Sequence, residues 1–227
     1  MKSSKKIKRF QEFLMNSWPA SDYYFLNGWI LRFNDGVTSR SNMFEEAIEL
    51  ADVKITEFPD KKEFFIDKTK SLKKLDRTEE GLQLIDGLLL QNPEDFGLLN
   101  YKAYWLAHFK KKEEAIEAIQ KAIDLDPTDG NYYDSYGEIL MGFEEYEEAI
   151  DKFKKAIELD PHGWYTYQTY TKMGESYKML GDYDAAEENL KMGKLSTNSC
   201  FCEFDTKKKW ADFSQKLIDE IKELKKE

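Results

Sequence analysis

The sequence predicts an all-α fold, or nearly so, in which pairs of helices stack one on the next into a superhelix. The first observation is that four of the five prolines stand 34 residues apart, at Pro59, Pro93, Pro127 and Pro161. The second is that small residues keep the same interval, at Ala47, Gly81, Ala115 and Ala149. Proline ends helices and small residues let two helices approach closely, so the period indicates a repeated helix pair.

The clearest copy of the unit spans residues 130–163. Two amphipathic helices flank a turn, which we place at Gly142 and the acidic residues after it. The packing positions are Tyr133, Tyr136, Gly137, Leu140, Ala149, Phe153, Ala156 and Pro161. This pattern resembles the tetratricopeptide (TPR) repeat, a 34-residue helix-turn-helix unit. The resemblance implies an α-α superhelix, since one unit alone cannot bury its apolar face.

The same register extends over most of the chain. We expect a repeat array over residues 44–198, with full units at about 62–95, 96–129, 130–163 and 167–200. A partial unit at 44–61 precedes them, with a helix from Phe44 to Phe58. The last unit runs three residues late, because Gly137 and Gly174 are 37 apart. Three residues make nearly one helical turn, which predicts that its first helix, from about Trp164 to Leu180, is longer at its start.

Residues 204–227 predict a capping helix. Its apolar face consists of Trp210, Phe213, Leu217, Ile221 and Leu224. Lysine and glutamate occupy the opposite face. A stacked array needs such a helix at its end, because the outermost surface must be polar.

Residues 1–43 do not follow the repeat. Residues 4–16 predict an amphipathic helix. Asp35-Gly36 lies between apolar or β-branched runs, which indicates a small β-hairpin ending in a strand at residues 37–42. Residues 23–33 also fit a first helix of the TPR type that carries an insertion, so hairpin and helix both remain open.

Residues 10–60 also resemble the leading segment of a group of acetyltransferases in the GNAT superfamily. The matching residues are Trp18, Pro19, Ala20, Gly28, Trp29, Leu31, Arg32, Phe33, Gly36, Thr38, Arg40 and Asn42. The resemblance implies an acetyltransferase-related protein. However, the glycine-rich loop that holds acetyl-CoA in that superfamily does not occur in this sequence.

Composition excludes several classes of function. The net charge of -10 disfavours nucleic acid, because phosphate contacts need clustered lysine and arginine. Apolar runs are too short to span a membrane, and without a signal peptide we expect a cytoplasmic protein. Cys200, Cys202, His108 and His162 are the only cysteines and histidines, so we expect no metal or other cofactor. No nucleophile-base pair or phosphate loop is present, so we expect no enzymatic activity.

The expected function is therefore a non-catalytic protein-protein interaction module or scaffold. The TPR resemblance implies that a protein or peptide partner lies in the groove lined by the first helix of each pair. The expected groove residues are Lys70, Lys73, Lys74, Asn100, Tyr104, His108, Asn131, Asp134, Glu138, Thr171 and Glu175. They change from basic to acidic along the array, which favours a partner of mixed charge. The alternative is an acetyltransferase-related protein.

Overall fold

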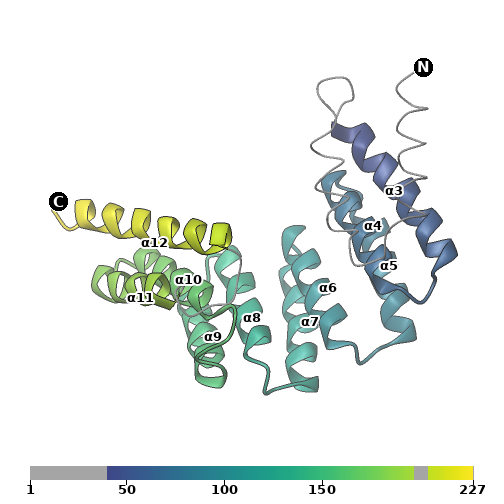
Figure 1. Ribbon diagram of the computed structural model, residues 1–227. Coiled ribbons are helices and arrows are strands. Elements are labelled where there is room, and N and C mark those ends of the chain that lie inside the picture. Colours follow the sequence, from purple (N-terminus) through teal and green to yellow (C-terminus); the bar gives the residue numbers. More distant parts are fainter. Residues whose placement is uncertain (1–39, 197–203, 227) are drawn as a thin grey trace. The chain divides into compact units, whose positions relative to one another are not determined.

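The computed structural model of the protein describes residues 40–196 and 204–226. Every regular element in these residues is an α-helix, and successive helices form antiparallel pairs, which confirms the predicted fold class (Figure 1). The expected helix at 4–16, most of the expected hairpin, and Cys200 and Cys202 lie outside the described residues. No helix in the described part of the chain is long and apolar enough to cross a membrane.

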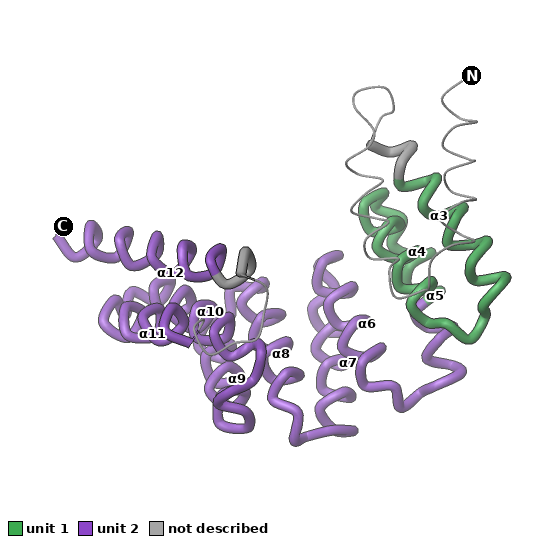
Figure 2. The backbone as a smooth tube through the Cα atoms, in the orientation of Figure 1, with its two compact units in different colours: residues 1–84 green, residues 85–227 purple. Residues whose placement is uncertain are grey.

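The chain divides into two compact units, residues 1–84 and 85–227 (Figure 2). Unit 1 contains α3 (Arg40–Glu57), α4 (Lys62–Lys74) and the start of α5 (Thr78–Gln91). Unit 2 contains the rest of α5 and the seven helices that follow. These are α6 (Phe96–His108), α7 (Lys112–Leu125), α8 (Gly130–Gly142), α9 (Tyr146–Leu159), α10 (Thr166–Met179), α11 (Tyr183–Ser196) and α12 (Phe204–Leu224).

The periodic prolines lie where the second helix of a pair has ended. Each stands two residues beyond the last residue of α3, α5, α7 or α9. Aspartates then start two of the next helices. The side chain of Asp95 accepts a hydrogen bond from the backbone N–H of Leu98, and that of Asp129 accepts one from Asn131, both at 2.9 Å. These contacts satisfy N–H groups that have no partner within the helix.

The turn inside each pair contains one residue in the left-handed conformation. These residues are Asp76, Lys110, Glu144 and Gly181, with φ between 55° and 81°. The residue after each donates its backbone N–H to a carbonyl in the last turn of the first helix, as from Glu145 to Leu140 at 3.0 Å. Such a bond closes a helix end. The turn expected at Gly142 and the acidic residues after it thus includes the observed turn residue Glu144, but Gly142 itself is the last residue of α8.

The two helices of a pair come close together where the first helix has a glycine. A Cβ atom at Gly137 would lie 2.5 Å from a ring carbon of Phe153 and 3.0 Å from the carbonyl oxygen of Ala149. Gly174 repeats this arrangement against Leu190 and Ala186. Because real Cβ atoms do not approach so closely, only glycine permits this spacing.

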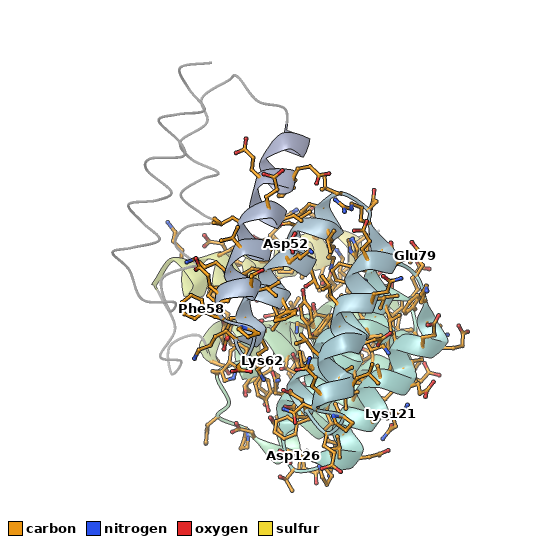
Figure 3. The ribbon with its side chains drawn as sticks, turned by 90° about the vertical axis from the view of Figure 1, so that its right-hand side faces the viewer. Asp52, Phe58, Lys62, Glu79, Lys121 and Asp126 are labelled. Atoms are coloured by element: carbon orange, nitrogen blue, oxygen red, sulfur yellow. The ribbon has the colours of Figure 1, made fainter. Side chains whose placement is uncertain are left out.

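Buried side chains continue from one pair into the next. The core of α8 and α9 contains Leu140, Ile150 and Phe153, and it also includes Met173 of α10. Charged residues such as Lys121, which pairs with Glu117 at 2.7 Å, project from the outer face of α7 (Figure 3). The solvated outer face and shared inner core are what an array of amphipathic helix pairs requires.

Helix α12 covers the end of the last pair, lying along α10 and α11 (Figure 1). Its Leu217, Ile218 and Ile221 are buried against Ala186 and Leu190 of α11. Polar contacts hold it at several points. Lys225, just beyond α12, contacts Asp184 at 2.8 Å and Glu187 at 3.0 Å. The buried apolar residues of α12 remove an apolar edge of α11 from water.

Two predictions about helix starts are wrong. Helix α3 begins at Arg40, so residues 40–42 are helical and not part of a strand. Helix α10 begins at Thr166 instead of about Trp164, because most of the three extra residues form a turn before the helix. In this turn Trp164 is 65% exposed, whereas Tyr165 is buried. The insertion is absorbed by the backbone of the connection and leaves α10 close in length to α6 and α8.

The close approach at Gly137 predicts a cost for a single added methyl group. Gly137→Ala should lower the free energy of unfolding by about 1–3 kcal/mol, because the Phe153 ring must move. Gly142→Ala is the matched control, since no atom lies within 4 Å of the added Cβ. It should change stability by about 1 kcal/mol or less, in the stabilising direction. Urea unfolding followed by circular dichroism tests this, and equal effects at the two positions would contradict the packing described here.

The contacts between α11 and the end of α12 predict an acid-sensitive stability. Hydrogen bonds from Lys191 and Lys225 lower the pKa of Glu187 from 4.5 to about 2. A carboxylate whose pKa is lower in the folded state stabilises the fold above its unfolded pKa, and this contribution is lost as the pH falls through its folded pKa. Glu187→Gln should therefore make the decline in stability between pH 4.5 and 2 less steep. Urea titrations at a series of pH values measure this slope, with Glu188→Gln, an exposed residue of the same helix, as the control.

Candidate functional site

The first helices of the pairs in unit 2, α6, α8 and α10, are neighbours. Helix α8 contacts both α6 and α10. Equivalent positions on the three helices follow the repeat, so Asn100, Asp134 and Thr171 correspond, as do Tyr104, Glu138 and Glu175. We call the surface formed by these positions the first-helix row.

A buried lysine joins two helices of this row. Lys172 of α10 contacts Asp134 of α8 at 2.9 Å and Glu138 of α8 at 2.7 Å. The side chains of Lys172 and Asp134 are only 8% and 7% exposed, whereas that of Glu138 is 45% exposed. Burying charges is unfavourable unless they are paired and hydrogen-bonded, so this geometry fixes α10 against α8 in one arrangement.

Two hydroxyl groups complete the network. Thr169 of α10 donates to Asp134 at 2.6 Å, and Tyr104 of α6 donates to Glu138 at 3.0 Å. Burial and the nearby Glu138 carboxylate hold the pKa of the Tyr104 phenol well above its ordinary value. Tyr104 therefore remains a proton donor near neutral pH. Hydrogen bonds and ion pairs thus connect all three first helices of unit 2.

Burial and charge act in opposite directions on the lysine at the centre. Burial alone would lower the pKa of Lys172, but Asp134 and Glu138 together raise it above its ordinary value. Burial also raises the pKa of Asp134, and Lys172 and Thr169 offset this only in part. Each partner therefore opposes the effect of burial on the charge of the other.

The structure brings three of the predicted site residues together: Tyr104, Asp134 and Glu138. Asn100 lies one turn before Tyr104, and its side-chain oxygen is buried without a hydrogen-bond partner among the described residues. Asn131 is half-buried in the first turn of α8. His108 is exposed at the end of α6, and its ring meets that of Phe109 edge-on at 4.9 Å.

Thr171 and Glu175 lie near the capping helix. Thr171 is 1% exposed and exchanges a hydrogen bond of 2.9 Å with Ser214 of α12, so it is inside the protein and not part of an open surface. Glu175 is half-buried, and burial raises its pKa, with Lys178 opposing and Glu220 adding to the shift. Lys178 itself pairs with Glu220 of α12. The row therefore ends at α12.

The three predicted lysines belong to α4 in unit 1. Lys70 contacts Asp67 at 3.0 Å, one turn earlier in the same helix. Lys73 is half-buried, and burial followed by the charge of Lys74 lowers its pKa. Lys74 is exposed. These residues form a basic end of α4 that we treat separately from the first-helix row.

Sequence reasoning missed Lys172 and Thr169, which hold the network together. A signal was present in the spacing. Tyr104 and Glu138 are 34 residues apart, which places them on neighbouring first helices, and Lys172 lies about one helical turn before Glu175, the position equivalent to Glu138. Complementary residues at the repeat interval can therefore indicate contacts between repeats. No group of histidine, cysteine or carboxylate side chains in the described residues could hold a metal ion.

The network predicts that removing the buried cation is costly. Lys172→Met should lower the free energy of unfolding by about 3–5 kcal/mol, because Asp134 is left buried without a counter-charge. Adding Asp134→Asn should recover part of the loss. Lys121→Met, which breaks an exposed pair, is the control and should change stability by about 0.5 kcal/mol or less. Urea unfolding distinguishes the variants, and equal losses for the two lysines would contradict a buried network.

Comparison with known proteins agrees with the helix-pair architecture. Two models of the tetratricopeptide repeat match the sequence, over residues 67–130 and 130–162. The solved structure of TTC0263, a thermophilic TPR protein of Thermus thermophilus, is similar with a TM-score of 0.58 and 16% identity. The alignment covers 76% of this chain and 91% of that one.

Other solved structures are similar at the same level. MamA of Desulfovibrio magneticus RS-1 has a TM-score of 0.54 and 20% identity over 81% of this chain and 97% of that one. A chain of the APC/C hetero-tetramer Cut9–Hcn1 has a TM-score of 0.54 and 18% identity, over 69% of this chain and 31% of that one. At these identities the likeness shows the fold alone.

No curated protein matches the sequence. Both matching family models are TPR models, and none of the structures named above is described as an acetyltransferase. The resemblance of residues 10–60 to GNAT acetyltransferases is therefore unsupported. The two family models agree with the fold: residues 67–162 of this chain match the tetratricopeptide repeat.

Proposed function

We propose that this protein is a non-catalytic interaction module that holds a protein or peptide partner on the first-helix row of unit 2. The observation that carries the proposal is the network of Tyr104, Asp134, Glu138 and Lys172. It holds polar and aromatic side chains of three helices in fixed positions. A surface that is ordered before binding loses less conformational entropy when a partner arrives.

Three further features support this role. TPR arrays generally bind extended or helical peptides on their first helices. A chain with a similar fold occurs in the Cut9–Hcn1 hetero-tetramer, where it is part of a protein assembly. Unit 2 also offers accessible side chains beside the network, because Glu138 is 45% exposed and Asn131 is half-buried. Unit 1 separately presents positive charge at Lys73 and Lys74 of α4.

Photo-crosslinking tests where the partner binds. A photoreactive residue in place of Asn131, on the same face of α8 as Glu138, should crosslink to a protein that mass spectrometry can identify. The same residue in place of Asp151, an exposed position on the outer helix α9, is the matched control. The partner should then be purified and its binding measured directly.

With purified partner, Tyr104→Ala and Asn100→Ala should weaken binding mainly by speeding dissociation, because well-packed contacts near the centre of an interface determine residence time. Surface plasmon resonance separates the two rate constants. The proposal is wrong if both variants bind normally while Glu117→Gln or Glu148→Gln on the outer helices abolishes binding.

A further inference from the structure

We infer that the first-helix row recognises a positively charged side chain on an extended segment of its partner, and that Glu138 is the carboxylate that receives it. This inference rests on the proposed function, because it names the chemistry of a partner bound at the same surface. It goes beyond that function because it assigns a positive charge to the partner and names the carboxylate of the row that contacts this charge.

The first step is the balance of charge in the network. Lys172 provides one positive charge, whereas Asp134 and Glu138 provide two negative charges. One negative charge is therefore in excess. Asp134 is 7% exposed and cannot present that charge to a partner, but Glu138 is 45% exposed. The excess charge is accessible at Glu138.

The second step is the orientation of the Glu138 carboxylate. Its Oε2 atom accepts hydrogen bonds from both Tyr104, at 3.0 Å, and Lys172, at 2.7 Å. Its Oε1 atom accepts none from the described residues. Two donors on one oxygen hold the group in place and leave the other oxygen open. Tyr104 also supplies aromatic surface beside the carboxylate, which an ammonium or guanidinium group can contact.

The third step is a second carboxylate on the next first helix. Glu175 of α10 occupies the position equivalent to Glu138, counted from Gly174 and Gly137. It is half-buried and forms no ion pair or hydrogen bond with other described residues. Burial raises its pKa, and the charge of Lys178 offsets this only in part, so the burial of its negative charge is incompletely compensated. A cation brought by a partner would compensate it.

Two carboxylates on the outer helices differ in this respect. On α7, Glu117 pairs with Lys121 at 2.7 Å, and on α9 Glu158 pairs with Lys155 at 2.9 Å. These outer carboxylates already have counter-charges within their own helix. Glu138, which has an open oxygen, and Glu175, which forms no ion pair with the described residues, thus lie on neighbouring first helices. In an extended segment, alternate side chains point the same way, so two of them can contact both carboxylates.

Defined peptides test this chemistry. Three short labelled peptides should share one sequence except for alternate positions that carry lysine, glutamine or glutamate. Fluorescence anisotropy with the full chain at low salt should show binding of the lysine peptide only, and added salt should weaken it. Glu138→Gln and Glu175→Gln should each weaken binding about two- to fivefold, the range for a single exposed ion pair.

The variants contain their own controls. Glu138→Gln retains an acceptor for Tyr104 and Lys172, and Glu175→Gln removes no hydrogen bond. Glu148→Gln on α9 removes one exposed charge from the outer face and should leave affinity unchanged. Equal weakening by Glu148→Gln would show general attraction to an acidic protein and would overturn the inference. Binding of the glutamine or glutamate peptide as tightly as the lysine peptide, or no binding of the lysine peptide, would also overturn it.

The two proposals can fail separately. If the partner crosslinks at residue 131 but the segment that contacts the row is acidic or uncharged, the proposed function stands and the inference about charge fails. If crosslinking occurs at residue 151 instead, the row itself is wrongly assigned.

Discussion

The close approach of the two helices in the pairs α8–α9 and α10–α11 is the constraint on which the rest of this structure depends. Gly137 and Gly174 have no side chain because Phe153 and Leu190 occupy the space that a Cβ atom would need. This spacing fixes the geometry of both pairs, and the core of α8 and α9 extends to Met173 of α10. First helices of successive pairs are then near enough for side chains to meet between them.

A polar network occupies that meeting point in unit 2. An interior of apolar side chains would hold the pairs together equally well, since buried ion pairs contribute little net stability. The network has another physical effect. It fixes which atoms face outward, because Lys172 and Tyr104 both bind one oxygen of Glu138. Stability and surface chemistry therefore depend on the same side chains in α8 and α10.

The fold was predictable from the sequence because proline and glycine restrict the backbone locally, and their spacing repeats. Helix ends near the four prolines were found for this reason. The left-handed conformation of Asp76, Lys110 and Glu144 was not predicted, since glycine is the residue that usually signals it. The site was predictable in part: Tyr104, Asp134 and Glu138 followed from their positions on the first helices. Lys172 did not, because its role depends on how α10 packs on α8, and Thr171 was misplaced because α12 covers it.

The three extra residues before α10 have a consequence for how the chain reaches this structure. The pairs α6–α7 and α8–α9 share a 34-residue period and similar packing positions. During folding, either pair can therefore pack against a helix that belongs beside the other pair. The connection between α9 and α10 differs in length and places Tyr165 in the interior. A pair joined in the wrong order would leave this side chain without its pocket. The irregular repeat thus makes the junction between α9 and α10 different from the other connections of a nearly periodic chain.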